Sequence, residues 1–267
     1  MALITVGRMD GLEPVALLTL NRPEQRNAVS SAMLEQLTAI LGDLAVDPEV
    51  RAVVLAGAGP DFCAGADVAE LAEALSGHAV VEYRRAFDRA FSAISDHPVP
   101  VIARIHGAAF GGGCQLAVAC DLAVAAEDAR LGIPSARLGI VISFESLERL
   151  VLAVGPKRAG EILFSGRVLS GGEAAAWGLV NRTVPASDLD AALREMASAV
   201  AEAAPLSVRG SKRGITTVLE NLRLERFTQG QQVADFEMMA AEALSSEDLR
   251  EGIRAFRERR KPRFKGT

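Results

Sequence analysis

The stretch that organises this chain is His106-Gly-Ala-Ala-Phe-Gly-Gly-Gly-Cys-Gln-Leu-Ala-Val-Ala-Cys-Asp121. The apolar run 99–105 precedes it and predicts a buried strand. Three consecutive glycines, 111–113, then allow the backbone to approach a ligand closely, and residues 114–119 predict a short buried helix. Because the first turn of a helix has unpaired N–H groups and a positive dipole end, the stretch predicts a site for an anion, or for an oxygen that becomes one.

The composition is that of an ordinary globular protein. The 267 residues are 49% apolar and 24% charged, and the net charge of -5 argues against a general nucleic-acid binder. No apolar run reaches the roughly 20 residues that a membrane-spanning helix needs, and the first residues lack the pattern of a secretion signal. The cysteines at positions 63, 114 and 120 lack metal-ligand spacing. We therefore expect reduced thiols, no metal and a cytoplasmic location.

The first part of the chain alternates strands and helices. Residues 3–6 and 15–20 predict a pair of strands, and 30–45 predict a helix that Ser30 caps. The wholly apolar run 52–56 predicts a strand that is buried on both faces. A strand, a helix and a second strand in this order predict a right-handed crossover unit and an α/β fold with a parallel sheet.

Two glycine-bearing loops leave the carboxyl ends of strands in this expected sheet. One covers 57–67, and the other follows the strand that ends at Ile105. Since these ends share one rim of a parallel sheet, backbone N–H groups near Ala64 and Gly112 are expected to converge on one oxygen as an oxyanion hole. The alternative is that both loops are merely tight turns. Neither loop completes the G-x-G-x-x-G pattern, which argues against a dinucleotide site.

Beyond residue 126 the pattern becomes mainly helical. The segment 134–142 predicts a loop, and from Pro205 onward the pattern is helical up to a basic tail. We place a soft boundary there, between a core at 1–204 and a helical oligomerisation domain at 205–267. The remaining expected elements are helices at 80–96, 144–154, 157–164, 173–177 and 189–203, and strands at 122–126 and 179–184.

The C-terminal tail is strongly basic. Between Arg254 and Lys265 there are seven basic residues and one acid, Glu258. Such a run is either a solvated face or a docking place for phosphate groups of a ligand or of a neighbouring subunit.

Several short motifs occur in order along nearly the whole chain: Leu20-Asn21-Arg22-Pro23-Glu24, Phe62-Cys63-Ala64-Gly65-Ala66-Asp67, Gly111-Gly112-Gly113-Cys114, Cys120-Asp121-Leu122, Gly178-Leu179-Val180-Asn181 and Glu251-Gly252-Ile253. Together they resemble the motifs of the crotonase superfamily, the enoyl-CoA hydratase/isomerase family. So many ordered matches are far more specific than any single motif.

The resemblance implies the crotonase fold, in which repeated β-β-α units wind into a spiral and a C-terminal helical domain forms trimers or dimers of trimers. It also implies an acyl-CoA ligand, with coenzyme A as part of the substrate and no separate cofactor. Carried over by motif, the amides that hold the thioester oxygen are those of Ala64 and Gly112, the same pair that the strand ends indicate.

The resemblance further implies contacts to coenzyme A. In the family, basic side chains near the Asn-Arg-Pro loop and in the C-terminal segment meet the phosphates. The coenzyme A-binding candidates in this chain are Arg26, Ala66, Asp67, Arg260 and Lys261.

The chain departs from the hydratases of this family at both catalytic carboxylates. The position after the Gly-Gly-Gly-Cys run holds Gln115, and the position after Ile133-Pro134 holds Ser135. Neither an amide nor an isolated hydroxyl acts as a base near neutral pH. Losing one general acid or base costs about 10²–10⁴ in rate, so ordinary hydratase turnover is not expected.

Glu145 is a candidate for a relocated acid or base. It follows the segment in which the chain departs from the family's glycine-rich pattern, where the family's loop borders the acyl chain. The alternative is an exposed residue that suits the positive end of a helix.

Three functions follow from these observations. The first is an acyl-CoA enzyme of fatty-acid or other acyl-CoA metabolism, a hydratase or isomerase by resemblance, with altered chemistry. The second is a non-catalytic acyl-CoA carrier, sensor or partner-binding protein that has lost the acid and the base. The third is a related enzyme, such as a decarboxylase, that needs enolate stabilisation more than a pair of carboxylates.

Overall fold

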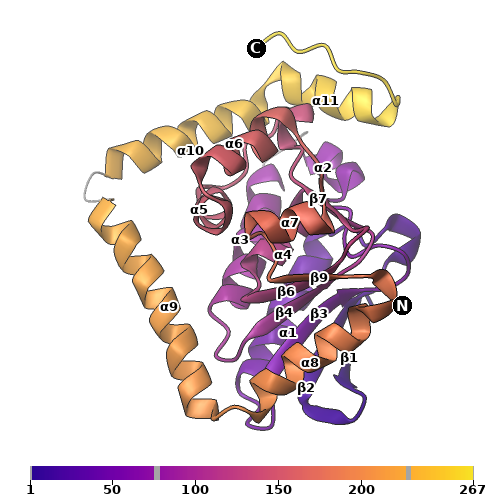
Figure 1. Ribbon diagram of the computed structural model, residues 1–267. Helices are drawn as coiled ribbons and strands as arrows, with labels where there is room; N and C mark the ends of the chain where they lie inside the picture. Colours follow the sequence, from indigo (N-terminus) through magenta and orange to yellow (C-terminus); the bar gives the residue numbers. More distant parts are fainter. Residues whose placement is uncertain (1, 75–78, 227–229, 267) are drawn as a thin grey trace.

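The computed structural model of the protein describes residues 2–74, 79–226 and 230–266, and Figure 1 shows how its elements are arranged. Its centre is a six-stranded sheet with the strand order β1-β2-β3-β4-β6-β9. The hairpin β1–β2 is antiparallel and the other pairs of this sheet are parallel, so the predicted α/β fold is confirmed. The strands are β1 Ile4–Met9, β2 Leu12–Leu20, β3 Ala52–Gly57, β4 Val101–Ile105, β6 Leu122–Ala126 and β9 Arg182–Val184.

Helices cover both faces of the central sheet. The side chains of β3 alternate between the two cores, because successive residues of a strand point to opposite faces. Val53 and Leu55 belong to the main core, whereas Val54 packs with Leu193 in a smaller core beneath α8. This alternation explains why the whole of 52–56 is apolar. The covering helices are α1 Ser31–Ala45 and α3 Ala79–Ser95, which contact each other, and α8 Leu189–Glu202.

The predicted helix after Ser30 is confirmed together with its cap. The Ser30 hydroxyl accepts a hydrogen bond from the Met33 N–H at 3.3 Å. The carboxylate of Glu70, on α2 (Val68–Ala74), accepts the Ser31 N–H at 3.0 and 3.2 Å. Two of the N–H groups that a helix start leaves unpaired are therefore satisfied, one of them by a distant part of the chain.

A second sheet of three short strands, with the order β5-β7-β8, accompanies the first. The expected elements do not include these strands, because segments of two or three residues carry no periodic pattern. β4, β5 and α4 (Gly112–Ala119) follow one another directly as one β-β-α turn of the chain. The strands are β5 Ala108–Phe110, β7 Arg130–Gly132 and β8 Leu169–Ser170.

The helices predicted between residues 144 and 203 are confirmed, but the strand predicted at 179–184 is wrong in its first half. α7 ends at Gly178, which adopts a φ of 83°. The N–H groups of Leu179 and Val180 then donate to the Ala174 carbonyl and close the helix end, so β9 begins only at 182. These helices are α5 Phe144–Val154, α6 Pro156–Ser165 and α7 Gly171–Trp177.

Three helices make up the C-terminal part of the chain. Figure 1 shows α9 as an arm along one side of the molecule, and α10 and α11 across one end of it. The Phe144 ring of α5 meets the Phe236 ring of α10 edge to face, with centroids 5.4 Å apart. None of the helices that the structure describes is long and apolar enough to cross a membrane. The division of the chain at 205 stays a prediction. The three helices are α9 Pro205–Arg226, α10 Gly230–Ser245 and α11 Glu247–Arg257.

A buried ion pair fastens α9 to the core. The side chain of Lys212 is 7% exposed, and its Nζ donates to Asp121 Oδ2 at 2.7 Å. The same Nζ donates to the carbonyls of Ile94 and Val99, at 3.2 and 3.1 Å. Asp121 Oδ2 also accepts the Val101 N–H at 2.7 Å, so this carboxylate joins the start of β4 to α9. Burial raises the pKa of Asp121, and the attraction of Lys212 opposes that rise.

We expect Lys212→Met to lower the free energy of unfolding by about 3 kcal/mol, because a partly buried carboxylate loses its counter-charge. Urea denaturation at neutral pH measures this change. Lys157→Met, at an exposed position of α6, is the matched control and should change the free energy by no more than ~0.5 kcal/mol. Equal stabilities of the two variants would contradict the structural role of the pair.

Candidate active site

The two glycine-bearing loops lie side by side, joined by backbone hydrogen bonds. The Phe62 N–H donates to the His106 carbonyl, and the Cys63 N–H donates to the Ala108 carbonyl, both at 2.9 Å. The Phe110 N–H returns a bond of 3.0 Å to the Cys63 carbonyl. Both loops leave the carboxyl ends of β3 and β4, which are parallel neighbours. The predicted meeting of the loops at one rim of the sheet is therefore confirmed.

The loop 21–27 packs against these two loops and is hydrogen-bonded to the first of them. The side chain of Asn27 is fully buried, and its Nδ2 donates to the carbonyls of Ala58 and Asp61, both at 2.8 Å. The Asp61 carboxylate accepts the Ala108 N–H at 2.7 Å and the Arg26 Nε–H at 2.6 Å. The hydrogen bond from Arg26 holds the pKa of Asp61 below its usual value. One carboxylate thus ties together three segments that lie far apart in the sequence.

Positions 112 and 113 require glycine because the neighbouring segments lie too close for a side chain. A Cβ atom on Gly113 would lie 2.2 Å from the Cys63 carbonyl oxygen, so no larger residue fits there. A Cβ atom on Gly112 would lie 2.6 Å from Cε1 of Phe87 and 3.5 Å from the backbone nitrogen of Ala66. Gly112 and Ala66 are therefore direct neighbours across the gap between the loops.

Of the two N–H groups predicted to form the oxyanion hole, the one of Ala64 is wrong. The Ala64 N–H donates to the Arg26 carbonyl at 2.9 Å and is not available to a ligand. The residues on either side of Ala66 exchange hydrogen bonds with Val29, so the Ala66 N–H points away from Val29. The Ala66 N–H has no acceptor among the described residues. The same holds for the N–H of Gly112, the first residue of α4.

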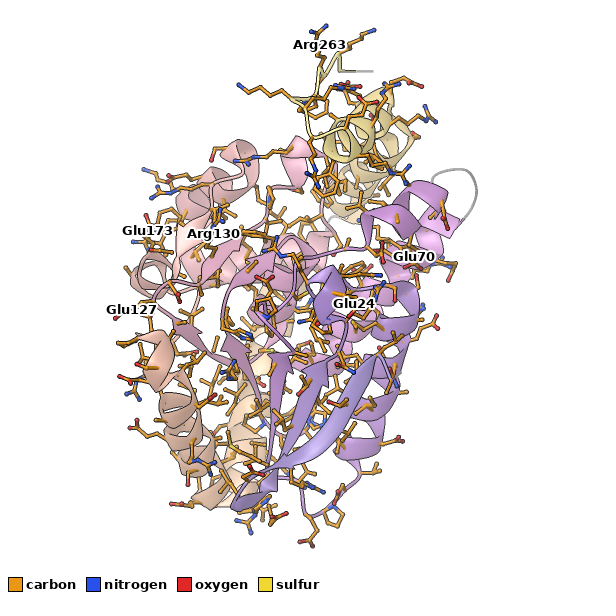
Figure 2. The ribbon with its side chains drawn as sticks, turned by 90° about the vertical axis from the view of Figure 1, so that its right-hand side faces the viewer. Glu24, Glu70, Glu127, Arg130, Glu173 and Arg263 are labelled. Atoms are coloured by element: carbon orange, nitrogen blue, oxygen red, sulfur yellow. The ribbon has the colours of Figure 1, made fainter. Side chains whose placement is uncertain are left out.

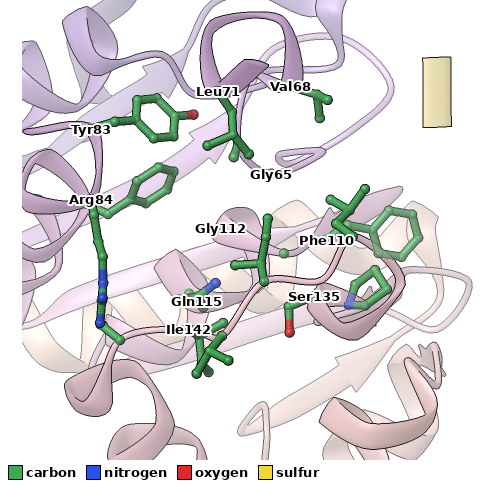
Figure 3. A pocket seen from close by; sticks show the side chains of 18 of the residues that line it. Gly65, Val68, Leu71, Tyr83, Arg84, Phe110, Gly112, Gln115, Ser135 and Ile142 are labelled. Atoms are coloured by element: carbon green, nitrogen blue, oxygen red, sulfur yellow. The ribbon is translucent and has the colours of Figure 1, made fainter. Parts of the chain in front are cut away.

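A cavity of about 260 Å³ opens beside these two amides. Its walls are mainly apolar, and Leu244 of α10 and Phe256 of α11 take part in them. Two unpaired N–H donors beside an apolar cavity can hold an oxygen and stabilise negative charge on it. Figure 3 shows Val68, Leu71 and Tyr83 on one wall, Gln115, Ser135 and Ile142 on the facing wall, and Gly112 between them.

Both positions that the resemblance assigns to acid–base residues line this cavity. Gln115 reaches it from α4, and Ser135 from the 3₁₀ turn Ser135–Arg137. Glu145 does not line the cavity, so the structure does not place it where a relocated acid or base would act. It lies in the first turn of α5, after the capping residue Ser143, as the alternative interpretation expected, but it is half-buried rather than exposed.

Two of the coenzyme A-binding candidates have structural partners. The Asp67 carboxylate accepts Arg22 Nη2–H at 3.0 Å and caps α2 through the Ala69 N–H at 3.1 Å. Arg26 pairs with Asp61, but its side chain is 55% exposed and can still meet a phosphate group from solvent. Asp67 is therefore a structural residue, while Arg26 keeps an exposed charge beside the loop that carries Ala66.

The basic side chains of the tail do not line the cavity. Arg260 and Lys261 line a separate groove along α11, together with acidic residues of that helix. Arg260 forms ion pairs with Glu251 and Glu258. Figure 2 shows Arg263 of the same tail extending from the end of the molecule that α11 covers. Within this chain the structure thus separates Arg260 and Lys261 from the predicted site.

The two buried thiols and the tyrosine hydroxyl near the cavity are neutral. Burial raises the pKa of the Cys63 and Cys114 thiols to about 12. The Tyr83 hydroxyl donates to the Val29 carbonyl at 3.1 Å, and burial raises its pKa as well. At neutral pH these groups keep their protons, so neither thiol is a nucleophile.

α3 supplies several residues of the cavity wall, whereas the sequence predicts only a helix at 80–96. Phe91 is buried in the main core, and Phe87 packs against that core. The structure adds Tyr83, Arg84 and Asp88 to the cavity wall. The signal for these residues is charge at positions one helical turn apart, directly beside the inward phenylalanines, since charged residues are rare on a buried face.

No cluster of three or more His, Cys, Asp or Glu side chains suited to a metal ion occurs among the described residues.

Comparison with known proteins gives consistent matches over nearly the full length. Residues 11–267 match the family model described as enoyl-CoA hydratase/isomerase. A short-chain-enoyl-CoA hydratase of Clostridium acetobutylicum is 35% identical over 252 residues, which cover 92% of each chain. The crystal structure of an enoyl-CoA hydratase/isomerase from Xanthobacter autotrophicus has a TM-score of 0.85 and 30% identity, covering 99% of both chains. Methylmalonyl-CoA decarboxylase in complex with 2-nitronate-propionyl-CoA has a TM-score of 0.89 and 25% identity, covering 100% of this chain and 99% of that one.

The two amides are distinguished by a pair of proline substitutions, since proline removes the N–H group. Ala64→Pro breaks the bond to Arg26 and should lower the free energy of unfolding by about 1–3 kcal/mol. Ala66→Pro removes an N–H with no acceptor and should change the stability by less than ~1 kcal/mol. Thermal and urea unfolding measure both. A larger loss in Ala66→Pro than in Ala64→Pro would show that the assignment of the free amide is wrong.

Proposed function

The chain belongs to the enoyl-CoA hydratase/isomerase family and has the crotonase fold, and we propose that it binds an acyl-CoA thioester and stabilises the enolate of that thioester. The N–H groups of Ala66 and Gly112 donate to the thioester oxygen, in place of the predicted pair Ala64 and Gly112. The observation that carries this proposal is that both N–H groups lack an acceptor among the described residues and border one apolar cavity. Such a donor contributes on the order of 3 kcal/mol to the transition state. Coenzyme A enters as part of the substrate, with no further cofactor.

The proposed chemistry does not use a pair of carboxylates. Gln115 and Ser135 occupy the two positions that resemblance assigns to glutamates, and both side chains face the cavity without a titratable group. Water addition across a 2,3 double bond through such a pair is therefore not the proposed reaction. What remains is the polarisation of the thioester carbonyl, which serves any reaction that passes through an enolate.

Decarboxylation is the second candidate reaction. The likeness to a methylmalonyl-CoA decarboxylase favours it. When a carboxylate leaves the carbon next to a thioester carbonyl as CO₂, its electron pair forms the enolate, so no base is needed for that step. Two amides that hold the enolate oxygen suit this chemistry.

A non-catalytic acyl-CoA carrier or sensor is the third candidate. The same replacements at Gln115 and Ser135 favour it, because they remove the proton-transfer groups and leave the binding cavity. Binding of acyl-CoA without any reaction at the carbon next to the thioester identifies this case.

Arg26 is the proposed contact to the phosphate groups of coenzyme A. Its carbonyl holds the Ala64 N–H, and its guanidinium is 55% exposed beside Asp61. Arg260 and Lys261 are partners for phosphates only of an acyl-CoA bound to a neighbouring subunit, since they lie in a separate groove of their own chain.

We also propose self-association into a trimer or a dimer of trimers. Large apolar side chains of the C-terminal helices are exposed in the single chain: Leu206, Ile215 and Val218 on α9, and Met238 and Met239 on α10. An exposed apolar surface of this kind is typical of a subunit interface. A cytoplasmic location suits the three free cysteines, because a reducing compartment keeps thiols unpaired.

The central experiment follows the hydrogens next to the thioester carbonyl. We expect the protein to bind butyryl-CoA in calorimetry and to exchange its C2 hydrogens for deuterium in D₂O, which mass spectrometry detects. Ala66→Pro should keep its fold and lose about 10²–10³ in exchange rate, since one amide donor is absent. No binding of any acyl-CoA would overturn the proposed function. Binding without exchange would favour the carrier, unless methylmalonyl-CoA releases CO₂.

Restoring the carboxylates tests why hydration is not expected. The double variant Gln115→Glu and Ser135→Glu should gain hydration of crotonyl-CoA by about 10²-fold or more over the parent, because the cavity otherwise remains suited to the thioester. The reverse reaction, loss of water from 3-hydroxybutyryl-CoA, provides a second readout. An unchanged rate in a variant that still binds acyl-CoA would mean that the cavity itself has diverged.

A further inference from the structure

The cavity contains one carboxylate that the proposed function has not used. Of the described residues that line it, Asp88 is the only one with a carboxylate, and Arg84 is the only one with a permanent positive charge. Gln115 and Ser135 cannot exchange a proton at neutral pH, and the Tyr83 hydroxyl keeps its proton because it is buried and donates to a carbonyl. Proton transfer inside the cavity therefore falls to Asp88.

The position of Asp88 is set by the packing of α3. Residues 83, 84, 87, 88 and 91 line the cavity, and this spacing describes one face of a helix. The Phe87 ring meets the Tyr83 ring edge to face at 5.3 Å and the Phe91 ring at 5.6 Å. Phe91 and the neighbouring Ala90 are buried in the main core. These contacts fix the rotation of α3, so the helix face that carries Asp88 is held toward the cavity.

The same packing brings this turn of α3 next to the free amides. The Phe87 ring stands 2.6 Å from where a Cβ atom of Gly112 would be, and Asp88 is the next residue along the helix. A second contact holds α3 against α5, because Arg149 Nη2 donates to Ser95 Oγ at 3.2 Å. The carboxylate is thus carried on a rigid element that borders the Gly112 amide.

We propose that Asp88 is the acid–base residue of this cavity and that it moves a proton on the enolate of the bound acyl-CoA, an inference that rests on the proposed function. With a 3-enoyl-CoA, the Asp88 carboxylate removes a proton from C2, and the C–H electron pair forms the C1–C2 double bond while the thioester oxygen takes the charge. The carboxylic acid then returns the proton to C4, the 2,3 double bond forms, and the carbonyl is restored.

This assignment selects a class of reaction. Moving one proton between C2 and C4 requires one carboxylate, which takes the proton and gives it back. Adding water requires one group to activate the water and a second to protonate carbon. A cavity with a single carboxylate therefore suits the shift of a double bond from the 3,4 to the 2,3 position of an acyl-CoA.

The test compares Asp88→Asn with Glu82→Gln, which removes an exposed carboxylate from the same helix. We expect Asp88→Asn to bind butyryl-CoA as the parent does and to lose about 10²–10⁴ in two rates, C2 deuterium exchange and conversion of 3-hexenoyl-CoA to 2-hexenoyl-CoA. Glu82→Gln should retain both. Rates are referred to the concentration of sites that bind butyryl-CoA, so a partly unfolded variant is still informative.

Asp88→Glu is the second variant, and it should recover part of both rates because it restores a carboxylate at the end of a longer side chain. Exchange and isomerisation at parental rates in Asp88→Asn would overturn the assignment while the proposed function stands. A parent that binds acyl-CoA and releases CO₂ from methylmalonyl-CoA, but neither exchanges C2 hydrogens nor isomerises, would also overturn it. A parent that binds no acyl-CoA would instead overturn the proposed function.

Discussion

The backbone contact between the loops after β3 and β4 is the constraint on which the site depends. The hydrogen bonds of Cys63 with Ala108 and Phe110 hold two loops in register that are far apart in the sequence. Asn27, fully buried, satisfies the carbonyls that this close approach would otherwise leave unpaired. The amides beside the cavity are therefore fixed before any ligand binds, and a preorganised donor costs no rearrangement when charge develops on its acceptor.

The sequence predicts those parts of the fold that repeat or that have a chemical signature. The helix capped by Ser30 and the two-sided strand 52–56 have such signatures, and both are confirmed. The three short strands of the second sheet have none. The site shows a sharper limit: residues two apart in a regular extended segment direct their N–H groups to the same side, but Gly65 between them has a φ of 107° and breaks this regularity, so Ala64 and Ala66 face different segments. Which N–H group is free is decided by the contacts with Arg26 and Val29, which lie outside the motif.

Gln115 and Ser135 stand at the two positions where the family resemblance places carboxylates, within the same framework. Both residues line the cavity, so these substitutions lie at the candidate site itself. A carboxylate on α3 reaches the same space from another direction, and the sequence conceals it because Asp88 stands between Phe87 and Phe91 on an amphipathic helix. Function in such a site depends on which elements supply charge, and that is decided by packing rather than by motif order.

The C-terminal helices supply part of the cavity wall, through Leu244 of α10 and Phe256 of α11. Docking of these helices and occupancy of the cavity are consequently coupled equilibria. A ligand that touches both the core and the C-terminal segment must, by thermodynamic linkage, stabilise the docked arrangement by the same factor by which docking increases its affinity. If a second copy of the chain covers the exposed apolar side chains of α9 and α10, as proposed above, subunit association and ligand concentration share one free-energy cycle.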